Sequence, residues 1–123
     1  MYRVALAGLL WLLPIGTALA QDPVKVDAKH YKVVFENAQV RVLRINYGPH
    51  EKSVMHEHPD SVAVFLTDYR TKFTDPDGKT EETTGKAGES VWSKGGKHLP
   101  ENTGDKPMEL TLVELKGTAA RSR

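Results

Sequence analysis

The sequence predicts an all-β domain, either a sandwich or a small barrel. Short runs rich in β-branched and aromatic residues are separated by turn signals at intervals of about 8–12 residues. The clearest turn signals are Pro76-Asp77-Gly78 and Gly95-Gly96. No segment shows a sustained helical period of apolar residues. With 123 residues, the chain has room for one domain with a single core.

Residues 1–20 predict a secretory signal peptide. Arg3 is the only charged residue of this segment, an apolar run follows over Val4–Leu13, and Ala18-Leu19-Ala20 is typical of a cleavage site. The run is shorter than the about 20 apolar residues of a membrane-spanning helix. We therefore expect a mature protein that begins at Gln21, works in the periplasm or is secreted, and has no membrane contact after cleavage.

After the signal, we expect a polar N-terminal lead-in (21–30), a β-domain (31–116) and a disordered tail (117–123). Within the β-domain, Leu43 and Ile45 share one face of their strand, and Leu110 and Leu112 alternate with more polar neighbours. The expected strands are Tyr31–Glu36, Gln39–Tyr47, Val54–His58, Ser61–Thr67, Arg70–Thr74, Thr80–Thr84, Ser90–Ser93 and Met108–Lys116.

Composition excludes several classes of function. The chain has 17 basic and 16 acidic residues and no basic stripe, which argues against nucleic-acid binding because phosphate contacts need clustered Lys and Arg. Cysteine is absent, so disulfides, thiolate metal sites, iron–sulfur clusters and thiol nucleophiles are excluded together. The five histidines are the main chemical resource that remains.

The most informative pattern is His56-Glu57-His58. On a strand, residues two apart point to the same face, so both imidazoles project one way and Glu57 the other. Two neighbouring imidazoles suit a divalent transition metal, and His98 offers a third ligand from a distant part of the chain. The alternative is a solvent-facing histidine pair with an unrelated surface histidine.

Two segments together resemble the motifs of the cupin superfamily. Gly48–Leu66 is similar to the first motif, a glycine followed by H-x-H and a strand. Gly88–His98, followed by Asn102, is similar to the second motif, although Ser93 stands where proline is usual. The resemblance extends over roughly Lys32 to Leu115 and implies a single-domain cupin jelly-roll β-barrel.

The resemblance also implies a metal inside the barrel, held by His56, His58 and His98. The glutamate that the family usually places about four or five residues after the second histidine is missing, since Val62 and Ala63 occupy those positions. We therefore expect three neutral ligands and a divalent transition metal, with iron, manganese, nickel, copper and zinc as candidates. Three neutral ligands leave the full charge on the ion, which attracts oxygen donors.

These features favour a small extracytoplasmic metallo-cupin that binds or acts on a small oxygen-rich molecule. Oxygenase, isomerase and lyase-type chemistry all remain open, as does enzymatic activity itself. The alternatives are a noncatalytic small-molecule or metal-binding module with a degenerate site, and a barrel with a vestigial, empty site. We expect a small-molecule ligand, no nucleic acid, and a homodimer in which Tyr31–Glu36 pairs with a second copy.

Overall fold

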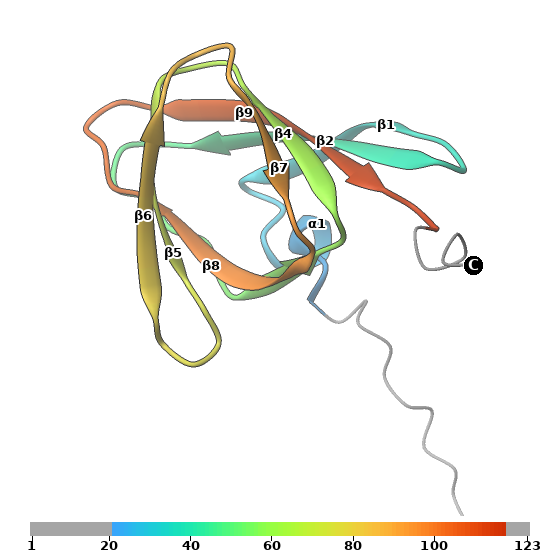
Figure 1. Ribbon diagram of the computed structural model, residues 1–123, viewed down its shortest axis with the longest axis horizontal. Helices are drawn as coiled ribbons and strands as arrows, with labels where there is room; N and C mark the ends of the chain where they lie inside the picture. Colours follow the sequence, from blue (N-terminus) through green and yellow to red (C-terminus); the bar gives the residue numbers. More distant parts are fainter. Residues whose placement is uncertain (1–20, 118–123) are drawn as a thin grey trace, which may run out of the picture.

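The computed structural model describes residues 21–117, which form a barrel of two antiparallel β-sheets (Figure 1). One sheet has the strand order β1-β2-β9-β4-β7 and the other has the order β3-β8-β5-β6. The predicted signal peptide and residues 118–123 of the predicted tail lie outside the described residues. The strands are β1 (Tyr31–Glu36), β2 (Val40–Tyr47), β3 (His56–His58), β4 (Ser61–Phe65), β5 (Tyr69–Thr74), β6 (Thr80–Gly85), β7 (Ser90–Ser93), β8 (Gly96–Asn102) and β9 (Met108–Leu115).

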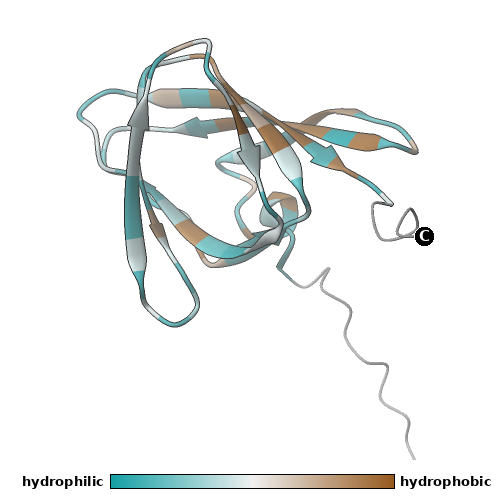
Figure 2. Ribbon diagram, in the orientation of Figure 1, coloured by the Kyte–Doolittle hydropathy of each residue, from teal (hydrophilic) through white to brown (hydrophobic). Residues whose placement is uncertain are grey.

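The core lies between the two sheets and is built mainly by β2, β4 and β9. Leu43 and Ile45 of β2 are buried, and the strand register sets them opposite Leu112 and Leu110 of β9. The period-2 pattern expected for these two strands is therefore confirmed. In Figure 2 most of the apolar colour lies on the sheet that contains β2, β4 and β9, whereas β6 ranges from white to the hydrophilic teal.

One strand was not predicted. The segment Gly96–Asn102 forms β8, which lies between β3 and β5 in the smaller sheet. Gly95-Gly96 is a local signal for a turn, and it predicts that the preceding strand ends before this segment. Pro100 follows the three residues that pair with β3, so it does not interrupt that ladder. Pairing with two neighbours, rather than local propensity, makes this segment a strand.

The segment 21–30 contains a short helix that the sequence also did not predict. Helix α1 (Pro23–Val26) is four residues long, which is too short to show a helical period of apolar residues. The Asp22 side chain caps it by accepting a hydrogen bond from the Val24 amide at 3.1 Å, and Pro23 occupies the first turn. Between residues 21 and 117, no helix has the length and apolar character to cross a bilayer.

Candidate metal centre

The pairing of two short strands brings the three predicted histidines together. His56 and His58 are two residues apart on β3 and point to the same face. Strand β3 pairs with β8 in a register that sets His56 directly opposite His98. Residues directly opposite in an antiparallel pair share one face of the sheet, so all three imidazoles project to the same side. His56 and His58 are buried there and His98 is half-buried.

The three rings form a compact triangle. Their centroids are 4.8 Å apart for His56 and His58, 5.0 Å for His56 and His98, and 5.2 Å for His58 and His98. One nitrogen of each ring lies within 4.8 Å of the other two. In the described chain, Nε2 of His56 and of His98 is buried without a hydrogen-bond partner. Buried polar atoms are nearly always satisfied, and a divalent transition metal shared by the three rings would satisfy both.

Hydrogen-bond acceptors set which nitrogen of two of these rings is free. Nδ1 of His56 lies 2.8 Å from the Val54 carbonyl oxygen, which can only accept, so this nitrogen carries the proton and Nε2 keeps its lone pair. Nδ1 of His58 lies 2.7 Å from Oε2 of Glu114 and donates to that carboxylate. Histidines that bind metals in proteins usually donate their other N–H to a carbonyl or a carboxylate in this way.

Burial keeps two of the imidazoles uncharged. Burial, and after it the neighbouring His58, lowers the pKa of His56 to about 4. Burial also lowers the pKa of His98 to about 3, with smaller contributions from the other two histidines. Because only a neutral imidazole offers a lone pair to a metal, both rings can serve as ligands at neutral pH.

A close approach of two loops sets the position of β8 beside the end of β3. A Cβ atom on Gly95 would lie 3.0 Å from backbone atoms of Pro59 and Asp60, so only glycine fits there without a shift. The Gly95 amide donates a hydrogen bond to Oδ1 of Asp60 at 2.7 Å, so this carboxylate fixes the loop that contains Gly95. The start of β8, and with it His98, is thereby held against the residues that follow His58.

No carboxylate among the described residues belongs to the cluster of candidate ligands. Val62 is half-buried and Ala63 buried on β4, at the positions where the resemblance leads one to look for a glutamate. Glu57 is half-buried and lies between the two histidines of β3, with its side chain on the opposite face of the strand. His50 is 63% exposed at the side chain and contacts Asp105 at 2.7 Å, away from the triangle.

A buried carboxylate that the sequence analysis missed stands behind His58. Glu114 is 2% exposed, and while Oε2 accepts from His58, Oε1 accepts from Nε of Arg41 at 2.6 Å. Arg41 also donates to both carboxylate oxygens of Asp22, at 2.8 and 2.9 Å. Burial raises the pKa of Glu114, but the hydrogen bonds from His58 and Arg41 outweigh it and hold the pKa below its usual value. The carboxylate therefore stays charged behind the histidine.

The sequence carried a usable signal for Glu114. Met108, Leu110 and Leu112 are the inward-facing residues of β9, and Glu114 is the next position in that series of alternate residues. A charged residue at an inward position of a strand predicts a buried ionic contact.

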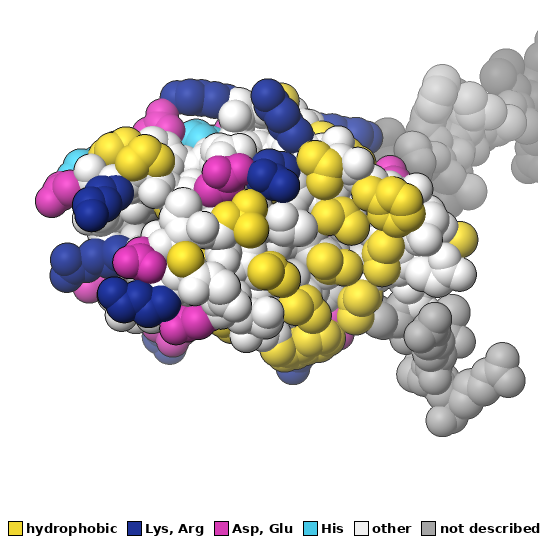
Figure 3. All heavy atoms as spheres, turned by 90° about the horizontal axis from the view of Figure 1, so that it is seen from above, with side chains coloured by type: hydrophobic (Ala, Val, Ile, Leu, Met, Phe, Trp, Pro, Cys, Tyr) yellow, Lys and Arg dark blue, Asp and Glu magenta, His cyan; other side chains and the backbone are white. Residues whose placement is uncertain are grey.

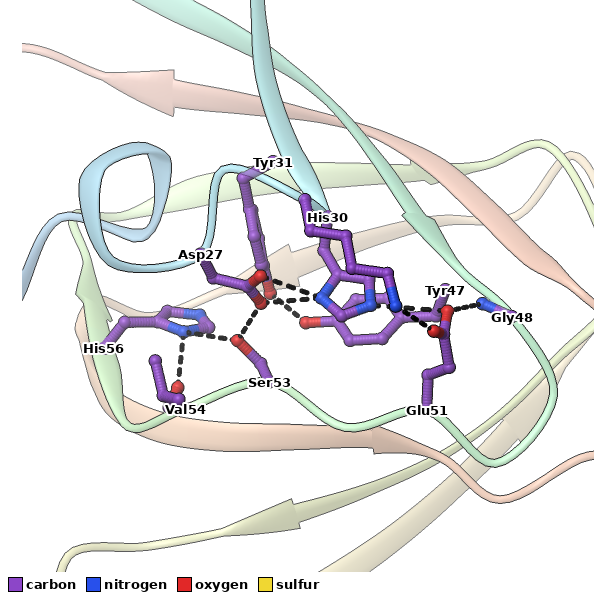
Figure 4. A network of polar contacts seen from close by, with 10 residues as sticks. Asp27, His30, Tyr31, Tyr47, Gly48, Glu51, Ser53, Val54 and His56 are labelled. Atoms are coloured by element: carbon purple, nitrogen blue, oxygen red, sulfur yellow. Dashed lines mark hydrogen bonds and ion pairs between the residues drawn. The ribbon is translucent and has the colours of Figure 1, made fainter.

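A second chain of polar contacts leads from His56 to the surface (Figure 4). Oγ of Ser53 lies 3.3 Å from Nδ1 of His56 and donates to Oδ2 of Asp27 at 2.5 Å. Asp27 contacts Nδ1 of His30 at 2.7 Å, and Nε2 of that ring lies 3.4 Å from Glu51, which is partly exposed. The segment 21–30 therefore supports a candidate ligand, a role that its reading as a polar lead-in did not suggest.

A cavity of about 290 Å³ adjoins the histidine cluster. His58 and His98 form part of its wall, and both sheets contribute apolar side chains. It is also lined by residues of β6 and β7, which are one edge strand of each sheet, so it reaches the surface between them. The main apolar wall residues are Ile45, Ala63, Phe65, Phe73, Val91, Trp92, Pro100, Met108, Leu110 and Leu112.

Comparison with solved structures identifies the fold. A cupin domain from Bordetella pertussis Tohama I superposes with a TM-score of 0.65 and 24% identity, over 71% of this chain and 92% of that one. An RmlC-like cupin family protein with a double-stranded β-helix fold, from Methanocaldococcus jannaschii, gives 0.57 and 16%, over 69% and 77%. An uncharacterized conserved protein with a double-stranded β-helix domain, from Klebsiella pneumoniae, gives 0.57 and 19%, over 87% and 93%.

The chain therefore has the all-β cupin jelly-roll fold, as the two sequence motifs led us to expect. No protein-family model and no curated protein sequence matches it. The cupin fold and the three clustered histidines together fit a metal-binding cupin.

Proposed function

We propose that the protein is a metal-dependent cupin that holds one divalent transition metal through His56, His58 and His98 and binds a small molecule beside it. The observation that carries this proposal is the pair of buried Nε2 atoms, on His56 and His98, that have no partner within residues 21–117. Iron, manganese, nickel, copper and zinc all bind imidazole readily. When bound, such an ion supplies Lewis-acid activation of an oxygen donor.

The residues around the cluster hold the rings in place. Glu114 accepts a hydrogen bond from Nδ1 of His58, which orients that ring and makes it a stronger electron donor. Val54 and Ser53 do the same for His56 with neutral acceptors. Phe73 stacks on His98 with the ring centroids 5.1 Å apart and the planes 23° from parallel. All three imidazoles are thus oriented by neighbours.

The cavity wall offers little for general acid–base catalysis. Of the described carboxylates, only Glu81 contributes to it, and this residue is exposed at the rim. Tyr31 and Tyr47 also line it, but burial raises the pKa of both phenols well above the usual value, so they stay protonated. Chemistry centred on a metal therefore suits this wall better than isomerase or lyase-type proton transfer by a side chain.

The same wall favours a second candidate, a noncatalytic module that captures a small ligand at the metal. An apolar cavity without a protein base is what a binding module needs. Turnover of a bound ligand under air separates the candidates, because a binding module releases its ligand unchanged.

We also propose that the protein acts outside the cytoplasm, with Gln21 as the mature N-terminus. Asp22, the residue after it, caps α1 and pairs with Arg41, so cleavage after Ala20 would retain these contacts. Mass spectrometry of the exported protein tests this proposal, and a retained segment 1–20 would contradict it.

The fold supports the proposal of a homodimer. Strand β1 is an edge strand, and three consecutive apolar side chains on it are exposed: Val33 by 41%, Val34 by 56% and Phe35 by 53%. Figure 3 shows hydrophobic side chains gathered at the end of the molecule where β1 lies. Pairing of two β1 edges would satisfy the free backbone groups of this edge and bring the apolar side chains of the two copies side by side. Light scattering at high micromolar concentration tests this, and a monomeric mass would contradict it.

The metal site is tested by titration with zinc and by elemental analysis of the purified protein. We expect one ion per chain and a raised melting temperature, since the ion binds only the folded site. His98→Ala should abolish binding, while His50→Ala and Glu57→Ala should retain it, because the first removes an exposed imidazole and the second a side chain on the opposite face. The proposal fails if none of the candidate metals binds or stabilises the wild-type protein.

A further inference from the structure

The walls of the cavity beside the histidines restrict the chemistry of its ligand. Leu110 and Leu112 from one sheet and Phe73 and Pro100 from the other face the same space. Apolar walls gain from contact with the apolar part of a ligand and offer nothing to a hydroxyl group that has lost its water.

The buried hydroxyl groups of the wall are already hydrogen-bonded, and its other hydroxyl and carboxyl side chains, among them Glu81, Thr83 and Ser93, belong to less buried residues. The Tyr31 and Tyr47 hydroxyl oxygens are 2.5 Å apart and hydrogen-bond each other. The hydroxyl of Thr71 donates to the sulfur of Met108 at 3.2 Å. A polyhydroxylated ligand would therefore leave several of its own donors and acceptors unsatisfied in the buried part of this cavity, which weakens binding strongly.

The size of the cavity suits a ring. An engineered apolar cavity of about 150 Å³ holds one benzene molecule. The space beside His58 and His98, about 290 Å³, is roughly twice as large. It accommodates a substituted ring whose donor group reaches the two histidines at its end.

The rim carries an exposed aromatic side chain. Trp92 on β7 lines the cavity and is 58% exposed, and Val91 beside it is 39% exposed. Large apolar side chains at a cavity entrance are a contact surface for an apolar ligand.

A second hollow of about 370 Å³ also touches His58 and His98, and it is more polar. Its charges have both signs: Asp75 and Glu81 oppose Lys94 and Lys97. The charges of this hollow therefore favour neither an anionic nor a cationic ligand.

We infer that the site takes a small, ring-bearing apolar molecule with one oxygen-donor group that ligates the metal, in place of the oxygen-rich molecule expected from the sequence. This inference rests on the proposed metal site and names its class of ligand. A carboxylate, a hydroxamate or an enolate on an aromatic or alicyclic ring has the required combination.

Three hydroxamates that share one metal-binding group test this inference. Acetohydroxamate has a small body, benzohydroxamate an apolar ring, and gluconohydroxamate a polyhydroxylated chain. Calorimetry measures their affinities for the zinc-loaded protein, and their affinities for aqueous Zn²⁺ give the baseline for the metal-binding group itself. Relative to that baseline, we expect benzohydroxamate to bind at least about tenfold more tightly than the other two.

Two pairs of variants test whether the ring of benzohydroxamate binds in this cavity. Ala63→Leu adds three carbon atoms inside the cavity, and Val64→Leu enlarges a side chain on the opposite face of β4 by one carbon atom. Trp92→Ala removes the aromatic rim, and Phe35→Ala removes an aromatic ring of similar exposure on β1. We expect Ala63→Leu to abolish the preference for benzohydroxamate over the other two hydroxamates. Trp92→Ala should reduce this preference several-fold. Neither variant should change the affinity for zinc. The two control variants should keep the preference.

The outcomes separate this inference from the metal site. If zinc binds but the three hydroxamates have equal affinities relative to the aqueous baseline, the proposed ligand class is wrong and the metal site stands. A preference that persists in both Ala63→Leu and Trp92→Ala would also overturn it, because the ring would then bind elsewhere. Failure of zinc and of every other candidate metal to bind would overturn both proposals. If Ala63→Leu does not fold, Trp92→Ala decides alone, since Trp92 is exposed and not part of the buried core.

Discussion

Replacing Glu114 with glutamine tests whether a buried charge orients the candidate metal ligand His58. The two carboxylate oxygens accept from different donors, Nδ1 of His58 at 2.7 Å and Nε of Arg41 at 2.6 Å. Glutamine has nearly the same shape but only one accepting oxygen, and its amide group donates. It can therefore accept from His58 or from Arg41, but not from both.

The loss of one accepting oxygen sets the expected loss of stability. One buried donor loses its acceptor, at a cost of about 1–3 kcal/mol. The remaining hydrogen bond loses the charge that strengthened it, about 1 kcal/mol more. Arg41 keeps its pair with Asp22, which limits the loss. We expect the free energy of unfolding to fall by about 2–4 kcal/mol and zinc affinity by about 10–100-fold, the usual effect of disturbing a group that orients a metal-binding histidine.

The chain offers a matched control on the same two strands. Arg44 and Glu109 also form an ion pair between β2 and β9, at 2.7 Å, but these side chains are 42% and 37% exposed and touch no histidine. Glu109→Gln should cost at most about 1 kcal/mol and leave zinc affinity unchanged. Urea unfolding of the metal-free protein and zinc titration against a competing chelator measure both effects. Wild-type zinc affinity in Glu114→Gln would refute the orienting role, and equal destabilisation by the two variants would refute burial as its cause.

Further predictions concern the metal-free protein. Its free energy of unfolding should fall by about 1.3 kcal/mol each for His56 and His98 between pH 7.5 and 5.5, because the unfolded rings bind protons near pH 6.5 and the folded ones only near pH 4 and 3. A flat profile in urea titrations over that range would contradict the lowered pKa values. Asn102→Ala should destabilise by about 2–4 kcal/mol in chemical denaturation, since its buried amide makes three hydrogen bonds to loop backbone at 2.8–3.0 Å. Leu43→Ala removes a fully buried side chain and should lower the free energy of unfolding by about 2–5 kcal/mol. Val34→Ala changes an exposed side chain and should lower it by less than about 1 kcal/mol. Equal decreases in melting temperature for the two variants would contradict the position of the core.

The parts of the fold that were predictable depend on a local period. A strand with one buried face must alternate, so the inward positions of β2 and β9 can be read from the order of residues alone, as Leu43 and Leu112 illustrate. The same parity places His56 and His58 on one face without any knowledge of the tertiary structure. The cupin motifs added His98, and the structure brings it opposite His56.

The parts that were not predictable depend on contacts between distant segments. Strand β8 begins at the second glycine of the Gly95-Gly96 pair and contains Pro100, so its local signals indicate a turn, and only pairing with β3 and β5 makes it a strand. The helix cap at Asp22 is short-range, yet the ion pair that commits Asp22 to Arg41 spans 19 residues and requires the folded barrel.

The sequence by itself determined the all-β class, the shared face of the first two histidines, and the absence of cysteine ligands and of a carboxylate at Val62 and Ala63. Tertiary structure alone decided that Glu114, 56 positions from His58, supplies a carboxylate behind that ring instead of at the metal position. It also decided that the wall beside the cluster is apolar, because the wall combines side chains from both sheets. The reason is physical: parity along a strand is a property of neighbouring residues, whereas a cavity and a buried ion pair exist only after distant strands pack against each other.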